Sequence, residues 1–261
     1  NLALAYNNRG LTKYDSGDKE GALADYERAI QLDPNLALAY NNRGLTKYDS
    51  GDKEGALADY ERAIQLDPNL ALAYNNRGLT KYDSGDKEGA LADYERAIQL
   101  DPNLALAYNN RGLTKYDSGD KEGALADYER AIQLDPNLAL AYNNRGLTKY
   151  DSGDKEGALA DYERAIQLDP NLALAYNNRG LTKYDSGDKE GALADYERAI
   201  QLYPNLALAY NNRGFAKWIS GDRQGAIADY ETAAQLYKKQ GNVEAYQKAL
   251  NILATIKELE P

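Results

Sequence analysis

The chain has 261 residues, of which 41 are acidic and 31 basic, and its formal net charge is −10. Cys, His and Met are absent, which excludes disulfides, thiolate chemistry, Cys or His metal sites and a histidine general base. The acidic balance argues against nucleic acid, whose binding depends on neutralising phosphates. No apolar run approaches the ~20 residues of a membrane span. We therefore expect no nucleic-acid partner, no membrane partner, no metal or cofactor, and a cytoplasmic location.

A period of 34 residues runs through most of the sequence. The first five copies are identical, the sixth differs only where Tyr203 replaces Asp, and the seventh is diverged. Repeat arrays grow by adding units to a stack rather than by enlarging one core. We predict seven tandem units and a C-terminal capping segment: residues 1–34, 35–68, 69–102, 103–136, 137–170, 171–204 and 205–238, then 239–261.

Each unit is predicted to hold two helices. The stretch NLALAYNNRGLTKYDSG forms the first, and Gly17 can adopt the left-handed conformation that ends it. Asp18 suits the N-cap of the second helix. Pro34 stops that helix, and Asn35 is predicted to cap the next one. No strand pattern is present, so the fold class is all-α.

Apolar residues at helical spacing predict which faces pack. The second helix of each unit carries such a stripe, and one unit alone leaves an apolar face uncovered. Residues 242–259 are predicted to form a helix that covers the last unit, although a partner-binding helix is the alternative. The two stripes consist of Ala22, Leu23, Tyr26, Ala29 and Ile30 in the first unit, and of Val243, Tyr246, Leu250, Leu253 and Ile256 in the capping helix.

The period and its small and aromatic positions resemble the tetratricopeptide repeat family. The matching residues of the first unit are Tyr6, Gly10, Ala22, Tyr26 and Pro34. The agreement of period and spacing covers residues 1–238. The resemblance implies a right-handed superhelical solenoid of helix-turn-helix repeats. The segments NRG and GAIADY are similar to cyanobacterial members of the family, and the near-identity of the copies fits either recent duplication or an engineered array.

Arg9 and Lys13 depart from the family pattern, which has Leu and Tyr at these places. An arginine in a leucine position is costly when it is left unpaired. We predict that its stem packs while its guanidinium pairs with Asp25 of the second helix. Glu27 is the rival partner.

By the same resemblance, the first helices line a concave groove that binds an extended peptide. Positions 4, 7, 8, 11, 14 and 15 of a unit share one helix face. The candidate groove residues are the asparagine pairs with nearby leucines and aromatic residues: Asn7, Asn8, Leu11, Tyr14, Asn41, Asn42, Leu45, Tyr48, Asn75, Asn76, Tyr82, Asn109, Asn110, Tyr116, Asn143, Asn144, Tyr150, Asn177, Asn178, Tyr184, Asn211, Asn212, Phe215 and Trp218.

Asparagine suits a peptide groove because its amide both donates and accepts hydrogen bonds. Asn8 and its copies match the backbone-gripping ladder in the array of O-GlcNAc transferase, so the asparagine pair is expected to face outward. The alternative is that these residues are merely solvated. Chaperone-binding members of the family hold a carboxylate with Lys and Arg in the groove, whereas Asn7 and Leu11 occupy those positions here, which argues against that activity.

Three further kinds of candidate groove residue each allow two interpretations. Asp15 and its copies favour a neutral or basic ligand or form a charged rim near a helix end. Tyr14 and its copies bind the ligand or pack between units. Trp218 anchors a ligand or packs against the end of the array.

The predicted function is that of a protein-protein interaction scaffold that binds a neutral to basic peptide or protein segment. An enzyme is not expected, because catalysis needs a unique constellation of residues and identical units supply a ladder instead. The alternative is a structural or self-associating array, such as a designed or model repeat protein, that associates through the uncovered end of its first unit.

Overall fold

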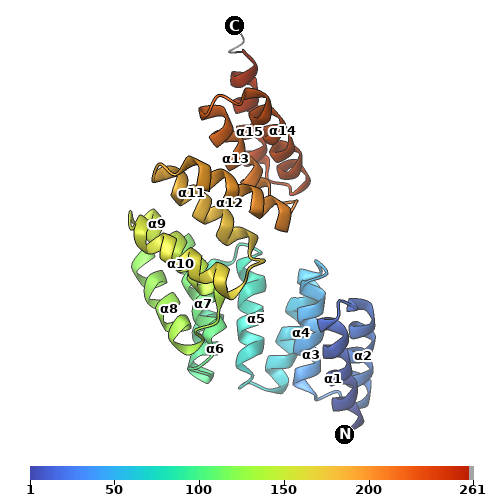
Figure 1. Ribbon diagram of the computed structural model, residues 1–261. Coiled ribbons are helices and arrows are strands. Elements are labelled where there is room, and N and C mark those ends of the chain that lie inside the picture. The colour runs from blue at the N-terminus through green and yellow to red at the C-terminus, as the bar shows by residue number, and fades with distance from the viewer. Residues whose placement is uncertain (259–261) are drawn as a thin grey trace. The chain divides into compact units, whose positions relative to one another are not determined.

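The computed structural model describes residues 1–258, which contain fifteen α-helices and no strand (Figure 1). The all-α prediction is confirmed. The helices are α1 (Leu2–Asp15), α2 (Lys19–Leu32), α3 (Ala37–Tyr48), α4 (Lys53–Leu66), α5 (Ala71–Tyr82), α6 (Lys87–Leu100), α7 (Ala105–Asp117), α8 (Lys121–Leu134), α9 (Ala139–Asp151), α10 (Lys155–Leu168), α11 (Ala173–Asp185), α12 (Lys189–Leu202), α13 (Ala207–Ile219), α14 (Arg223–Lys239) and α15 (Val243–Glu258).

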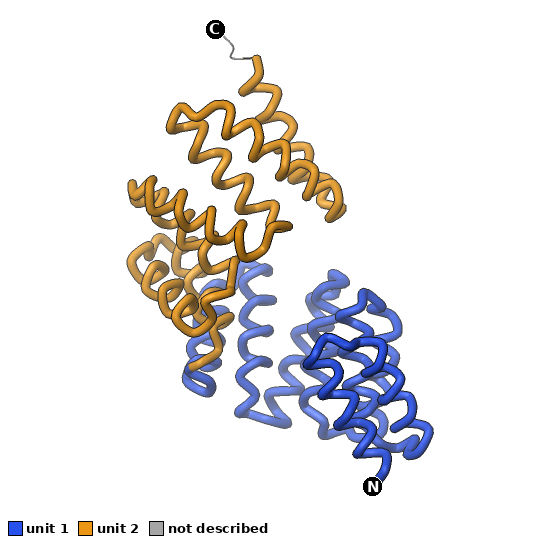
Figure 2. Tube along the Cα trace, turned by 45° about the vertical axis from the view of Figure 1, so that its right-hand side comes forward, with its two compact units in different colours: residues 1–136 blue, residues 137–261 orange. Residues whose placement is uncertain are grey.

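The helices form two compact units, residues 1–136 (unit 1, α1–α8) and the chain from residue 137 onward (unit 2, α9–α15), coloured separately in Figure 2. Within each unit, odd- and even-numbered helices pair, as α1 does with α2 and α11 with α12. The second helix of one pair packs on the first helix of the next, and successive first helices also touch, as α3 does with α1 and α5. Within each of the two units, each helix pair thus lies against its neighbours in a regular stack.

The turn inside each pair follows the local sequence. Gly17 has φ = +86° and ends α1, as predicted. Asp18 caps α2, and its Oδ1 accepts a hydrogen bond from the backbone N–H of Gly21 at 2.9 Å. The Asn35 prediction is wrong: Leu36 is the N-cap of α3 and makes no side-chain cap bond. The backbone N–H of Asn35 instead donates to Oδ1 of Asp33 at 3.0 Å, because that side chain closes a turn just before the helix.

Each pair packs a tyrosine of its second helix against a glycine of its first. Tyr26 is fully buried, as are Ala22 and Ala29 of the same helix. A Cβ added to Gly10 would lie 2.7 Å from Cε1 of Tyr26, closer than a carbon contact allows. The close approach predicted from the small residues is therefore confirmed, and a larger side chain at Gly10 would force the two helices apart.

The last helix, α15, packs on α14 as expected of a cap. Leu253 and Ile256 join the core formed with Tyr230. The prediction is wrong for Val243, whose side chain is 75% exposed at the first turn of the helix. Ala234 stands where earlier copies have Ile, and it packs beneath Ala249 of α15. The smaller residue leaves room for the capping helix.

Candidate functional site

Each first helix carries one stripe of four positions that points away from its second helix. In α3 the stripe consists of Leu38, Asn42, Leu45 and Asp49, at spacings of four, three and four residues that keep them on one helix face. Leu38 and Asp49 are exposed, while Asn42 and Leu45 are partly buried. We call the four positions the outward stripe.

The first residue of every outward stripe is an exposed leucine. The exposed fraction of these side chains is 41–43%, and the copies in interior repeats do not become buried. They are Leu4, Leu38, Leu72 and Leu106 in unit 1, and Leu140, Leu174 and Leu208 in unit 2. Because neighbouring first helices touch within each unit, the leucines form a row on its surface.

The asparagines form hydrogen bonds with one another. Asn7 donates to Oδ1 of Asn8 at 3.2 Å, and Asn42 of the next repeat donates to Oδ1 of Asn7 at 3.1 Å. The pattern continues within both units, and we call it the amide ladder; its bonds between repeats join Asn76 to Asn41, Asn110 to Asn75, Asn178 to Asn143, and Asn212 to Asn177.

The amide ladder corrects the expectation that both asparagines face outward. Asn7 and its copies Asn41, Asn75, Asn109, Asn143 and Asn177 are buried. Within the two compact units, Asn7, Asn41, Asn75, Asn143 and Asn177 each accept a hydrogen bond from the following repeat. Asn211 of the last pair is partly buried. The second asparagine is exposed in the first pair (Asn8) and partly buried in the later pairs, except that Asn178 is buried. A ligand-binding role for either asparagine remains a prediction.

The tyrosine of the candidate groove bridges neighbouring repeats. The Tyr14 hydroxyl donates to Oδ2 of Asp49, and Tyr48 does the same to Asp83. Burial and the adjacent Asp83 carboxylate raise the pKa of Tyr48 above its ordinary value, so the hydroxyl keeps its proton and acts as a donor. Tyr82 and Asp117, and Tyr150 and Asp185, make the same pair.

The predicted pairing of Arg9 with Asp25 is confirmed. Nε and Nη2 of Arg9 donate to the two carboxylate oxygens of Asp25 at 2.7 and 2.6 Å. Nζ of Lys13 lies 2.9 Å from Oδ2 of the same carboxylate, a second partner that the sequence argument missed. The sequence did contain a signal for this second partner, because Lys13 lies four residues after Arg9 and therefore on the same face of the helix. Glu27 interacts electrostatically with Arg43 of the next repeat instead.

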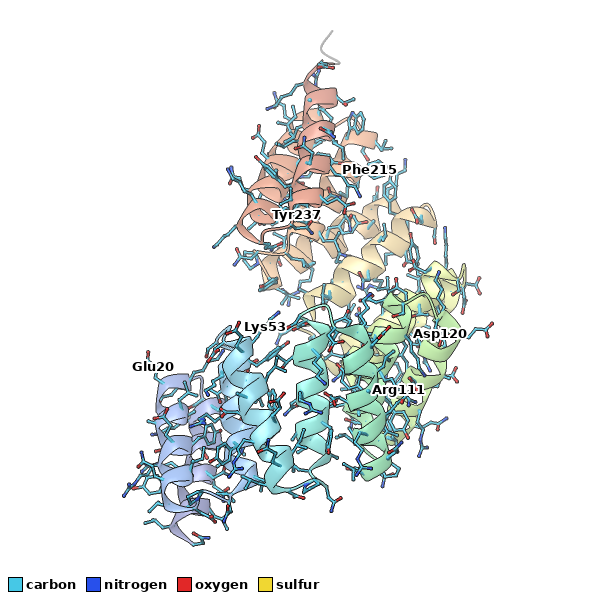
Figure 3. The ribbon with its side chains drawn as sticks, turned by 180° about the vertical axis from the view of Figure 1, so that it is seen from behind. Glu20, Lys53, Arg111, Asp120, Phe215 and Tyr237 are labelled. Carbon is cyan, nitrogen blue, oxygen red and sulfur yellow. The ribbon has the colours of Figure 1, made fainter. Side chains whose placement is uncertain are left out.

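The shared carboxylate is nearly buried in every repeat. Hydrogen bonding from Arg9, and further from Lys13, lowers the pKa of Asp25 to about 2. Arg9 is 59% exposed, whereas Arg43 in the next repeat is only 19% exposed. The same Arg–Asp–Lys group recurs in each pair, and one example is Arg111 with Asp127 and Lys115. Arg111 is labelled in Figure 3. The two residues that depart from the family pattern thus tie the two helices of a pair together.

The first helix of the seventh pair, α13, differs from the first helices of the other pairs. Phe215 replaces the second leucine of the outward stripe and is 42% exposed; its ring meets Tyr184 edge-on, with centroids 5.6 Å apart. Trp218 packs against the core that includes Leu253, which favours the packing interpretation. Ile219, the last residue of the stripe, is exposed and was missed. Comparison with Asp185, 34 residues earlier, would have revealed it.

Residues 1–258 carry neither a candidate metal centre nor a candidate membrane span. No group of three or more acidic side chains lies close enough to hold a metal ion in this part of the chain. None of its helices is both long and apolar enough to cross a membrane.

Comparison with known proteins places the repeats in a family. A TPR repeat model matches five overlapping segments, and a tetratricopeptide repeat model matches a sixth; the segments are residues 10–51, 44–85, 78–119, 112–153 and 146–187, and then 173–206. No curated protein sequence matches the chain.

Several solved structures resemble this one. The structure titled APC/C hetero-tetramer Cut9-Hcn1 aligns with a TM-score of 0.85 at 16% identity over 98% of this chain, which spans about half (49%) of that chain. Yeast Tom70 aligns with a TM-score of 0.65 at 22% identity, covering 98% of this chain and 54% of the other. At these identities the likeness concerns the fold alone.

One neighbour is closer in sequence. YrrB, described as a TPR protein with an unusual peptide-binding site, aligns with a TM-score of 0.51 at 26% identity over 70% of this chain and 95% of its own. The family models cover most of the repeat region, and the paired helices match the fold of these neighbours. The chain belongs to the tetratricopeptide repeat family, whose fold is typical of protein-protein interaction scaffolds.

Proposed function

We propose that the chain is a non-enzymatic scaffold whose outward stripes bind an extended segment of a partner protein. The observation that carries the proposal is the row of leucines, each about two-fifths exposed and repeated on touching helices within a unit. Burying these side chains against a partner would supply most of the affinity. YrrB, a neighbour in the same family, is described by its peptide-binding site.

The polar residues of the stripes would orient the bound segment. Asn42 uses one amide hydrogen to bond Asn7 and one oxygen lone pair to accept from Asn41. A primary amide has two hydrogens and two acceptor positions, so one of each is available to a peptide backbone. The exposed carboxylate of Asp49 at the end of the stripe favours a neutral or basic segment.

The test is selection of a displayed peptide library against the chain and against a leucine-row variant in which Leu38, Leu72, Leu106, Leu140, Leu174 and Leu208 are changed to Gln. A matched control introduces as many glutamines at exposed alanines of the second helices: Ala58, Ala92, Ala126, Ala160, Ala194 and Ala228. All three proteins are first shown to be equally helical. Peptides enriched on the chain and the control, but not on the leucine-row variant, support the proposal. Equal enrichment on all three, or none on any, contradicts it.

Self-association through α1 is a second candidate. Leu2, Ala5, Tyr6 and Arg9 line a shallow pocket on α1. The equivalent positions of the next repeat, Ala39, Tyr40 and Arg43, lie on α3, and α3 packs on α2. Arg43 is accordingly much less exposed than Arg9. The α1 face therefore matches an interface used inside the array. Sedimentation at rising concentration should show mass growth that Leu2→Glu abolishes; a constant monomer mass would exclude this candidate.

A further inference from the structure

The outward stripe of α13 departs from all the others. Its four residues are Leu208, Asn212, Phe215 and Ile219, where earlier repeats have Leu, Asn, Leu and Asp. Ile219 is 49% exposed and stands in place of a carboxylate. The acidic end of the stripe is thus replaced by an exposed aliphatic side chain. Because apolar surface left in water does not stabilise the fold, the isoleucine adds no folding stability through burial at this position.

The isoleucine at position 219 also changes the contacts of Tyr184 on the neighbouring first helix, α11. Earlier tyrosines donate to the aspartate of the next repeat, as Tyr150 does to Asp185. Ile219 offers no acceptor, and Tyr184 lies edge-on against Phe215 instead, with an interplanar angle of 61°. The side chains of Tyr184, Leu208, Phe215 and Ile219 form an aromatic and aliphatic surface that we call the α13 patch. Phe215 is labelled in Figure 3.

A carboxylate adjoins the α13 patch. Asp185 is exposed and directly follows Tyr184 on α11. The cations of α13 are engaged elsewhere, because Arg213 and Lys217 both bind the nearly buried Asp229, at 2.7 and 2.9 Å. One oxygen of the Asp185 carboxylate accepts from Tyr150, which leaves the other oxygen to pair with a cation of a ligand, whereas Arg213 and Lys217 are held by Asp229. This arrangement complements an apolar side chain with a basic residue beside it.

We propose that the α13 patch anchors the bound segment, taking a bulky aliphatic or aromatic side chain while an adjacent Lys or Arg pairs with Asp185. The inference rests on the proposed function and adds to it the chemistry of the partner and the point where binding is strongest. Identical repeats give a ligand no preferred register, whereas one departing repeat supplies it. A basic segment with one large apolar residue then binds in a single register.

The test uses the sequence of the other repeats. F215L/I219D restores the residues found at these positions in the six other units, so the variant keeps a stripe that already folds in this context. V243D is the matched control, since it exchanges an exposed aliphatic residue for a carboxylate on α15, outside the patch. A displayed peptide library is selected on the unaltered chain, and the affinity of the enriched peptides is measured for all three proteins.

We expect enriched peptides to combine a bulky apolar residue with a neighbouring Lys or Arg. Their affinity should fall at least about 10-fold on F215L/I219D, a loss comparable to leaving one large apolar side chain unburied, and should be unchanged on V243D. Equal affinity for F215L/I219D overturns the anchor and leaves the proposed function standing. If no peptide is enriched on the unaltered chain, both the anchor and the proposed function fail. If the chain dimerises and F215L/I219D alone dissociates the dimer, a second copy occupies the patch and the peptide anchor is wrong.

Discussion

The carboxylate of Asp25, like each of its copies, forms ion pairs with both an arginine and a lysine of the first helix. In the interior of unit 1, Asp93 accepts two hydrogen bonds from Arg77, and Nζ of Lys81 lies 2.9 Å away. A buried carboxylate is stable only when such partners replace its hydration. Removing it leaves two partly buried cations without a counter-charge, so its contribution should exceed that of an exposed ion pair.

We expect Asp93→Ala to lower the free energy of unfolding by about 2 kcal/mol. This lies between the ~0–1 kcal/mol of exposed pairs and the ~3–5 kcal/mol of fully buried ones, since both cations keep some exposure. Urea denaturation measures the change. Glu95→Ala is the control, because it removes an exposed carboxylate two residues away. Equal losses for the two variants would show that the group adds no more stability than an ordinary surface charge.

Acid should weaken the same group at the start of the array. The pKa of Asp25 is lowered to about 2, below the ~3.9 of an unfolded chain. A lowered pKa gives stability that is present above about pH 4 and is lost as the pH falls toward 2. Thermal unfolding of the chain and of Asp25→Asn should therefore converge over this pH range. A stability difference that stays constant from pH 5 to 2 would contradict the assignment.

At the scale of helices, contacts between first helices connect one repeat to the next. Asn76 donates to Asn41 and accepts from Asn75, at 3.1 and 3.2 Å. Lys53 adds a hydrogen bond to the carbonyl of Asp83 at the end of α5, where a cation also suits the helix dipole. The stack therefore combines apolar packing with polar contacts that fix how successive first helices are rotated.

Asn76→Ala should destabilise unit 1 by about 1–2 kcal/mol, because the buried Asn41 and Asn75 each lose one hydrogen bond, as acceptor and as donor respectively. Asn8→Ala is the internal comparison. Asn8 is exposed and its replacement removes the bond from Asn7 alone among those described. Asn8→Ala should therefore lower the free energy of unfolding by less, since water can replace the lost hydrogen bond to Asn7. Denaturation of both variants in the same buffer decides, and equal costs would mean that the amide ladder adds no stability between repeats.

The capping helix offers a second comparison within one element. Ile256 is fully buried beside Tyr230, whereas Val243 is largely exposed. Ile256→Ala should cost about 2–5 kcal/mol through lost burial and the cavity left behind. Val243→Ala should cost less than about 0.5 kcal/mol. Hydrogen exchange of α15 would report the loss locally, and similar protection in both variants would contradict the packing of this helix.

At the scale of the whole chain, the predicted division into seven 34-residue repeats implies how the protein responds to shortening. Repeat stability is approximately a sum of unit and neighbour contributions. Deleting residues 69–102 removes one full period and joins two identical neighbours. The shortened protein should keep its helical content per residue, with a lower unfolding midpoint and a smaller denaturant dependence. Loss of cooperative unfolding would show that the period is not the structural unit.

The sequence by itself determined the features that depend on short-range physics. The period, the helix pairs and the Asp18 cap follow from local spacing and side-chain chemistry. Gly10 against Tyr26, and Arg9 with Asp25, lie within one pair and were predictable from the residue types that such a pair needs. The Asn35 cap failed because the Asp33 side chain accepts a hydrogen bond from the backbone N–H of Asn35 and closes a turn there, so that α3 begins only at Ala37 with Leu36 as its N-cap.

Only the tertiary structure decided which side chains join neighbouring repeats. Asn7 and Asn8 are adjacent, and one residue rotates by about 100° around a helix, so packing against the next repeat determines that the first is buried. Tyr14 meets Asp49, and Asn42 meets Asn7, across 35 residues of chain. Such pairings depend on the offset and rotation of successive helices, which are set by the sum of many packing contacts rather than by any local pattern.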